Sequence, residues 1–172
     1  GRPVYASAKG LWMAALLFHA ALGIVCLRHL RWFTDPAISW AGALSSLDGF
    51  LETGTPTLYM SDAILVTTLL FLLARRLVVP TLRYISLAAD YIPLLLLLGI
   101  GISGLWMRHL DPVDLYRVKA LAMGWVHLDP GSPRGIGTVF YVHLFLVCAL
   151  AASFPFTKLM HMGGIFLSPT RN

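Results

Sequence analysis

Long apolar stretches alternate with shorter polar segments along this chain of 172 residues. A helix needs about 20 predominantly apolar residues to cross the hydrocarbon core of a bilayer. Four stretches meet that requirement, at about 11–33, 58–79, 88–108 and 137–160. The pattern predicts an all-α integral membrane protein with four transmembrane helices in one membrane-embedded domain over residues 1–172.

Two of the connections between these stretches carry helical patterns of their own. In 34–57, apolar residues recur on one side and acidic residues such as Asp48 lie opposite, which is typical of a short helix on the membrane surface. In 111–128 we expect a second amphipathic helix, with Asp111 as its cap and Asp114 at the positive end of the helix dipole. The remaining connection is short.

Composition agrees with a membrane protein. Hydrophobic residues make up 58% of the chain and charged residues 12%, whereas an ordinary soluble domain is about 25% charged. The net charge of +5 reflects Lys and Arg at the membrane ends and indicates neither nucleic acid nor an acidic substrate. Cys26 and Cys148 fall within the first and last spans, where they cannot build a disulfide framework.

Basic residues favour one orientation by a narrow margin. If the chain enters the first span from the inner side, inner segments hold seven Lys and Arg and outer segments hold six. The inner side of membrane proteins is usually the more basic one. Arg28 and Arg108 stand at helix ends, where each can pair with a buried carboxylate instead of marking topology. We therefore expect the first span to begin on the inner side.

Four histidines are the strongest functional signal in the sequence. His19 and His29 lie in the first span, and His143 lies in the last span with His161 just beyond it. Ionisable residues within membrane segments are rare and usually functional. Two helices that each carry two histidines can hold two bis-histidine haems, because each iron takes one axial ligand from each helix. The alternative is four unrelated histidines that hydrogen-bond between helices.

Helix direction selects the histidine pairs. The first and last spans run in opposite directions, so His29 pairs with His143 near the outer side and His19 pairs with His161 near the inner side. The separations along the two helices are about 15 Å and about 27 Å. Eighteen residues make five helical turns and return the last two histidines to one face, although Pro155 should kink that helix.

Haem propionates would need basic partners. Arg28 and Arg108 are the candidates near the outer side and Arg83 near the inner side. Each arginine could instead contact lipid headgroups from a snorkelling side chain. Gly23, which lies between the first two histidines, and the glycines of the third span could admit a flat macrocycle or simply allow close helix packing.

Three segments carry a family resemblance: LFHAALGIVCLRH, AADYIPLLLLLGIGISGL and FYVHLFLVCALAASFPFTKLMHM. They resemble the gamma subunit of respiratory nitrate reductases. The resemblance implies a five-helix dihaem cytochrome b bundle that exchanges electrons between membrane quinol and a soluble iron–sulfur partner. It also implies two haem b groups on the four histidines named above. The first helix of the family has no counterpart here, so we expect an upstream helix before Gly1.

The ending MGGIFLSPTRN resembles one branch more closely, the DsrM subunit of the sulfite-reduction-associated DsrMKJOP complex. That branch implies a DsrK-like cytoplasmic iron–sulfur subunit as partner, together with other membrane-complex subunits, in dissimilatory sulfur metabolism. The inner side would then be the docking surface for the soluble subunit. Its expected contacts are Arg83, Lys158 and Arg171, each of which could bind lipid headgroups instead.

The resemblance also implies that menaquinol or another quinol reacts beside the outer haem. The nitrate reductase branch uses a lysine for which the nearest counterpart here is Glu52, so the pocket does not transfer directly. Lys119 and His127 are the polar candidates in the outer segments, because quinol oxidation releases protons and an imidazole can accept one. A solvated loop histidine is the alternative for His127. His109 ends a span and is interpreted as an interfacial residue.

Together these observations predict a multi-pass subunit of a respiratory electron-transfer complex in the cytoplasmic membrane of a bacterium or archaeon. Quinol oxidation would occur at this subunit, with a cytoplasmic iron–sulfur subunit as the electron acceptor. Related alternatives are the cytochrome b of a nitrate reductase or of a heterodisulfide-reductase-like complex. An alternative of a different class is a haem-free membrane anchor that only docks other subunits.

Overall fold

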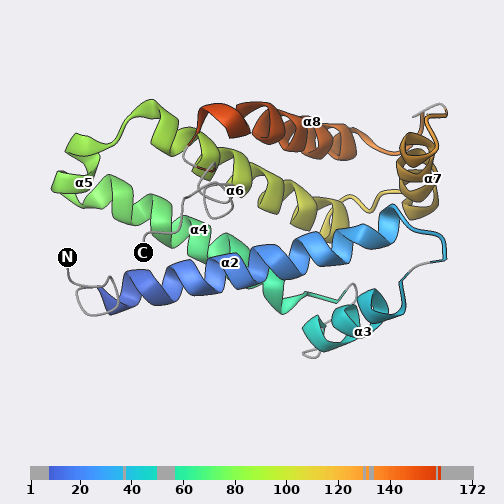
Figure 1. Ribbon diagram of the computed structural model, residues 1–172, viewed down its shortest axis with the longest axis horizontal. Helices are drawn as coiled ribbons and strands as arrows, with labels where there is room; N and C mark the ends of the chain where they lie inside the picture. Colours follow the sequence, from blue (N-terminus) through green and yellow to red (C-terminus); the bar gives the residue numbers. More distant parts are fainter. Residues whose placement is uncertain are drawn as a thin grey trace, which may run out of the picture.

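The computed structural model describes residues 8–36, 38–49, 57–129, 131, 134–157 and 159, and helix is the regular secondary structure throughout this part. Four long helices form its body: α2 (Lys9–His29), α4 (Met60–Val78), α6 (Ala88–His109) and α8 (Thr138–Ser153). They are arranged as a row in chain order (Figure 1), in which α2 packs on α4, α4 on α6, and α6 on α8. The helices α2 and α8 are therefore at the two ends of the row.

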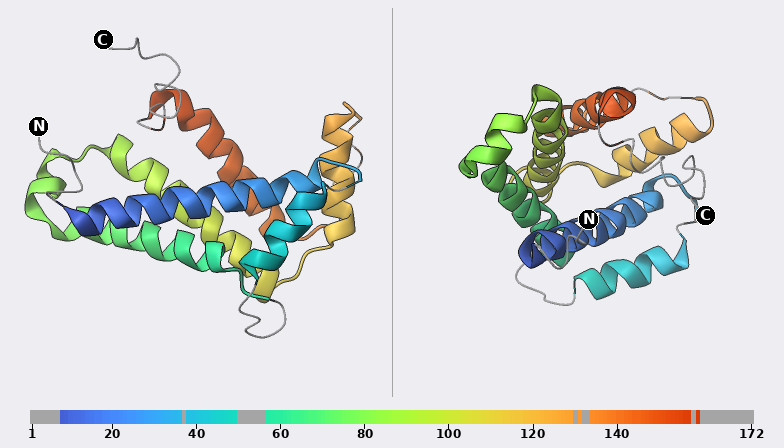
Figure 2. Two further views of the ribbon diagram at one scale, coloured as in Figure 1. Left: turned by 60° about the horizontal axis from the view of Figure 1, so that its bottom comes forward. Right: turned by 60° about the vertical axis from the view of Figure 1, so that its left-hand side comes forward.

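Shorter elements lie at both ends of these helices. The 3-10 turn η1 (Leu30–Trp32) extends α2 and leads to α3 (Ser39–Asp48). Figures 1 and 2 show α3 and α7 (Leu115–Val126) at one end of the long helices and α5 (Pro80–Ile85) at the other. We call these the α3–α7 end and the α5 end. Figure 2 also shows that α6 and α8 are inclined to α2 and α4.

Three helical segments in the described part of the chain are long and apolar enough to cross a membrane. They are Lys9–Trp32, Ala88–His109 and Thr138–Phe156. The remaining expected span is present as the 19-residue helix α4, but Asp62 in its first turn and Arg75 and Arg76 in its last turn make it more charged. Helices are thus found at all four predicted positions, and three of them have the composition of a span.

The core is small and the apolar surface is large. Ala21, Leu65, Leu69 and Leu97 form the buried cluster that joins α2, α4 and α6. The helix α8 buries none of its residues, and many Leu, Ile, Phe and Trp side chains elsewhere are exposed. An apolar surface of this extent marks contact with lipid, cofactor or other protein rather than with water.

The last span ends earlier than predicted. The α-helix stops at Ser153 and continues only as the 3-10 turn η2 (Phe154–Phe156), so the five-turn count from His143 to His161 is wrong. Pro155 is the reason, because proline lacks an N–H and its ring clashes with the preceding turn. His161 itself lies outside the described residues, as do Glu52, Lys158 and Arg171.

The predicted amphipathic helix within 111–128 is confirmed as α7, but its cap is not Asp111. The helix begins three residues later, at Leu115. The carboxylate of Asp114 accepts hydrogen bonds from the backbone N–H groups of Tyr116 and Arg117 at 3.0 and 3.2 Å. Asp114 is therefore the N-cap, with the side-chain chemistry that helix starts prefer.

Candidate functional site

His29 and His143 both lie toward the α3–α7 end. His29 is the last residue of α2, and His143 lies in the second turn of α8. The two imidazoles are close enough to interact electrostatically, although their helices stand at opposite ends of the row. His19 lies ten residues earlier on α2, about 15 Å nearer the α5 end.

Each histidine that the structure describes in these pairs uses its Nδ1 atom in a hydrogen bond. His19 Nδ1 donates to the carbonyl oxygen of Ala15 at 2.7 Å, and His29 Nδ1 donates to that of Val25 at 2.7 Å. A ring that donates through Nδ1 carries its lone pair on Nε2, the nitrogen that can ligate a metal. In metal-ligating histidines, the ring nitrogen that does not bind the metal commonly makes such a hydrogen bond, which orients the ring.

The Nδ1 atom of His143 finds its hydrogen-bond partner on another helix. Its Nδ1 lies 2.9 Å from the hydroxyl oxygen of Ser103 on α6. A Cβ atom at the neighbouring Gly104 would lie 3.6 Å from Cε1 of His143, an ordinary van der Waals contact, so this turn of α6 packs directly beside the ring. The packing of α6 against α8 thus determines how this imidazole is turned.

These residues fit a bis-histidine haem. The Nε2 atoms of His29 and His143 come from two helices, as two axial ligands require. Gly23 lies between the two histidines of α2. No described atom comes within 4 Å of the position that a Cβ atom would take there, so this part of the helix surface is open. Within the described ranges no three metal-ligating side chains gather, and a bis-histidine haem uses only two.

A buried ionic cluster adjoins His29 in the chain. The Arg28 guanidinium contacts the Asp48 carboxylate of α3, donates to Ser61 Oγ at 2.9 Å, and pairs with Asp62 Oδ2 at 3.3 Å. Ser61 also donates to Asp48 from its backbone N–H at 2.8 Å. Arg28 further lies 3.6 Å above the ring of Tyr59. This cluster joins α2, α3 and the start of α4.

The cluster revises the expected position of Asp48. The pattern of α3 placed Asp48 on the polar, outward side, but only 6% of the residue is exposed because Arg28 binds it. The alternative role for Arg28, pairing with a buried carboxylate, is the one observed. Arg108 donates to the Thr57 carbonyl oxygen at 2.8 Å and lies 4.1 Å from the Tyr59 ring.

At the α5 end the arginines differ in exposure. Arg76 is 3.4 Å from Asp90 Oδ2 and donates to Ser86 Oγ at 3.3 Å. Arg83, on α5, is exposed. A propionate role for Arg28, Arg83 and Arg108 stays a prediction.

The two residues predicted for quinol chemistry lie on or next to α7. Lys119 forms an ion pair with Asp35 at 3.0 Å, which holds α7 to the segment that follows η1. His127 is the exposed residue that follows the last turn of α7. Neither side chain lines the two cavities described below.

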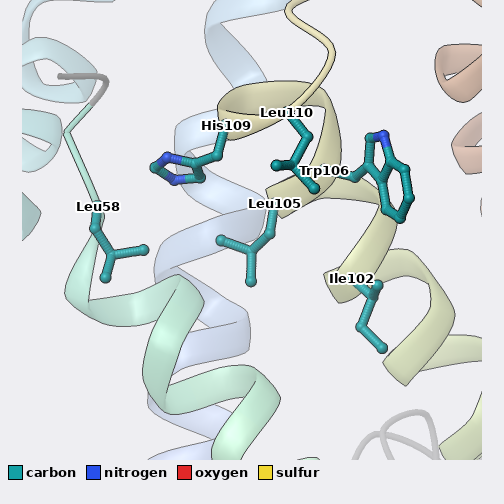
Figure 3. Close-up of a pocket in the computed structure, with 6 residues that line it drawn as sticks. All are labelled: Leu58, Ile102, Leu105, Trp106, His109 and Leu110. Carbon is teal, nitrogen blue, oxygen red and sulfur yellow. The ribbon is translucent and has the colours of Figure 1, made fainter.

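A cavity of about 510 Å³ opens at the same end of the molecule, between the start of α4 and the end of α6. Figure 3 shows the His109 ring extending from α6 toward Leu58, above Leu105. The Nε2 atom of His109 is buried and has no hydrogen-bond partner among the described residues. The full lining is Leu58, Ile102, Leu105, Trp106, His109 and Leu110.

Sequence reasoning treated His109 as an interfacial residue. The available signal was its place at the end of a span, in the turn after Trp106. Ile102 and Trp106 also border a second cavity, of about 330 Å³, which is lined by Ser103 as well. Ile102, which lines the cavity with His109, directly precedes Ser103, whose hydroxyl lies against His143.

Apolar helices that carry His29 and His143 toward one end, each with its Nδ1 in a hydrogen bond, fit a membrane protein of the b-cytochrome class. The family model described as "Nitrate reductase gamma subunit" matches residues 5–170. The chain belongs to this family, and the family implies haem b as the cofactor.

Two archaeal relatives are described as "Hdr-like menaquinol oxidoreductase cytochrome b-like subunit". The protein from Archaeoglobus fulgidus is 42% identical over 169 residues, which cover 96% of this chain and 51% of the relative. The protein from Archaeoglobus profundus is 39% identical over 168 residues, covering 95% of this chain and 50% of the relative. This chain spans about half the length of these curated relatives.

Proposed function

We propose that this chain is the dihaem b subunit of a membrane electron-transfer complex that oxidises quinol. The observation that carries the proposal is that His29 and His143 lie on two helices toward one end of the molecule, with each Nδ1 held by a hydrogen bond. Bound haem supplies one-electron transfer. The names of both archaeal relatives, which describe menaquinol oxidoreductase subunits, support the same role.

The protein groups would hold and orient the cofactors. His29 and His143 would present Nε2 to the outer haem, and His19 with His161 would do so for the inner haem. The exposed apolar side chains of α2 and α8 would exclude water from the macrocycle. Haem quantification on the purified protein tests this assignment, because about two b haems per chain are expected. A haem-free protein would favour the membrane-anchor alternative.

For the quinol site we propose the cavity at His109. A quinol must lose two protons with its two electrons, and an imidazole can accept a proton. The Nε2 atom of His109 is buried without a hydrogen-bond partner among the described residues. The apolar lining suits a quinone ring. The exposed His127 and the paired Lys119 remain the competing candidates from sequence.

The test compares two histidine substitutions in haem-loaded protein. His109→Gln should lower the rate of quinol-analogue oxidation by about 10²-fold or more, the usual scale for loss of a general base. His127→Gln should leave that rate near wild type. The opposite pattern would return the site to α7, and haem content measured in both variants separates chemistry from loss of cofactor.

For the electron acceptor we propose a cytoplasmic iron–sulfur subunit of the DsrK type, docking at the α5 end, in dissimilatory sulfur metabolism. The resemblance of the ending MGGIFLSPTRN to the DsrM subunit supports this partner, and the exposed Arg83 on α5 is its expected contact. The cytoplasmic membrane is the proposed location. Arg83→Glu should weaken association with that subunit while leaving haem reduction by a quinol analogue unchanged. Unchanged association together with failed haem reduction would instead place quinol oxidation at the α5 end and subunit docking at the α3–α7 end.

A further inference from the structure

Ser103 lies between two helices with its hydroxyl against a proposed haem ligand. It is 7% exposed, and its Oγ is 2.9 Å from Nδ1 of His143, forty residues later in the chain. The same Oγ is 3.1 Å from the carbonyl oxygen of Ile100, one turn earlier on α6. One serine hydroxyl thus connects the backbone of α6 to an imidazole of α8.

The direction of these hydrogen bonds follows from the chemistry of the groups. A hydroxyl has one hydrogen to donate and two lone pairs to accept with. The Ile100 carbonyl can only accept, so Ser103 gives its hydrogen to Ile100. Ser103 must then accept from Nδ1–H of His143. In that tautomer the lone pair of His143 is on Nε2, where an iron would bind.

We propose that Ser103 is a positioning residue for the outer haem: it selects the Nε2-ligating tautomer of His143 and fixes the rotation of the ring. The proposal rests on the proposed function, in which His143 is an axial ligand. His19 and His29 differ, because each donates to a carbonyl four residues earlier on its own helix. Only for His143, among the described ligands, does ring orientation depend on a second helix.

This arrangement has a consequence for the iron. An acceptor on Nδ1–H makes the imidazole a stronger donor to the metal, which favours the oxidised state. Removing the hydroxyl should therefore raise the midpoint potential of the outer haem and change its low-spin electron paramagnetic resonance signal, because ring orientation also relaxes. The inner haem, held by His19, should be unaffected in the same molecules.

The experiment is a redox titration with electron paramagnetic resonance on the full chain in its membrane complex. Ser103→Ala should raise the potential of one haem only, and Ser103→Thr, which keeps the hydroxyl, should restore it. Ser153→Ala is the matched control: Ser153 donates to the Leu150 carbonyl at 2.9 Å, three residues back on the helix of His143, and has no hydrogen bond to a histidine among the described residues. That variant should match wild type in both potentials.

Each outcome decides the proposal. Selective loss of the outer haem from Ser103→Ala, with retention in Ser103→Thr, would also support positioning. Unchanged potentials and spectra in haem-loaded Ser103→Ala would overturn the positioning role while leaving the proposed function intact. Equal shifts or losses of both haems would also overturn it, since they indicate a general packing defect. A wild-type chain without haem would overturn the proposed function itself, and the positioning role with it.

Discussion

At the scale of single residues, the most consequential arrangement is the buried arginine beside a haem-ligand candidate. The side chain of Arg28 is 7% exposed and that of Asp48 is 4% exposed. A buried charge is costly unless it is paired and hydrogen-bonded. Asp48, Ser61 and Asp62 meet that need from α3 and α4. The direction of α2 just before His29 therefore depends on residues from two other helices.

Breaking this cluster should destabilise the protein strongly. Asp48→Ala leaves Arg28 buried without its main partner, which typically costs about 3–5 kcal/mol. Lys119→Ala breaks an ion pair that is largely exposed, with Asp35 at 67%, and should cost less than about 1 kcal/mol. Denaturant unfolding in detergent measures both. Equal effects of the two substitutions would show that the Arg28 cluster does not hold the structure together.

At the scale of elements, local rules explain some helix boundaries and not others. Hydropathy alone locates α2 and α6 to within a few residues. The end of α8 at Ser153 follows from Pro155, whose effect on the helix is greater than a kink. The short helix α5 begins with Pro80 at its first position, which favours a helix start.

The start of α7 gives a test of capping. Asp114→Ala removes the acceptor for the N–H groups of Tyr116 and Arg117 and should cost about 1 kcal/mol. Asp111→Ala, three residues earlier, should have little effect because that residue precedes the cap. Hydrogen exchange of the first-turn amides of α7 is the measurement. Faster exchange in the Asp111 variant alone would restore the cap expected from sequence.

Contacts between distant segments could not be predicted from the sequence. The class of fold, the helices and the candidate ligands His19, His29 and His143 are readable from hydropathy and spacing. The carbonyl partners of His19 and His29 lie four residues back and follow from helix geometry. The Ser103–His143 contact and the burial of Asp48 depend instead on the register between helices, which no local pattern encodes.

At the scale of the whole molecule, the proposed haem ligands come from the two ends of the row of helices. These helices pack on α4 and α6 respectively and lie at the two ends of the row. A haem held between them would add a direct connection between the two ends of the row. On the proposed function, haem would therefore join the helices as well as transfer electrons.

The central claim is that His29 and His143 hold one haem and His19 holds the other, and redox titration of haem-quantified variants tests it most directly. His29→Ala, His143→Ala and the double variant should each retain about one b haem and lose the same redox component. His19→Ala should lose the other component, and combining it with His143→Ala should leave no haem. Different components lost in His29→Ala and His143→Ala, or both haems lost in their double variant, would contradict the pairing.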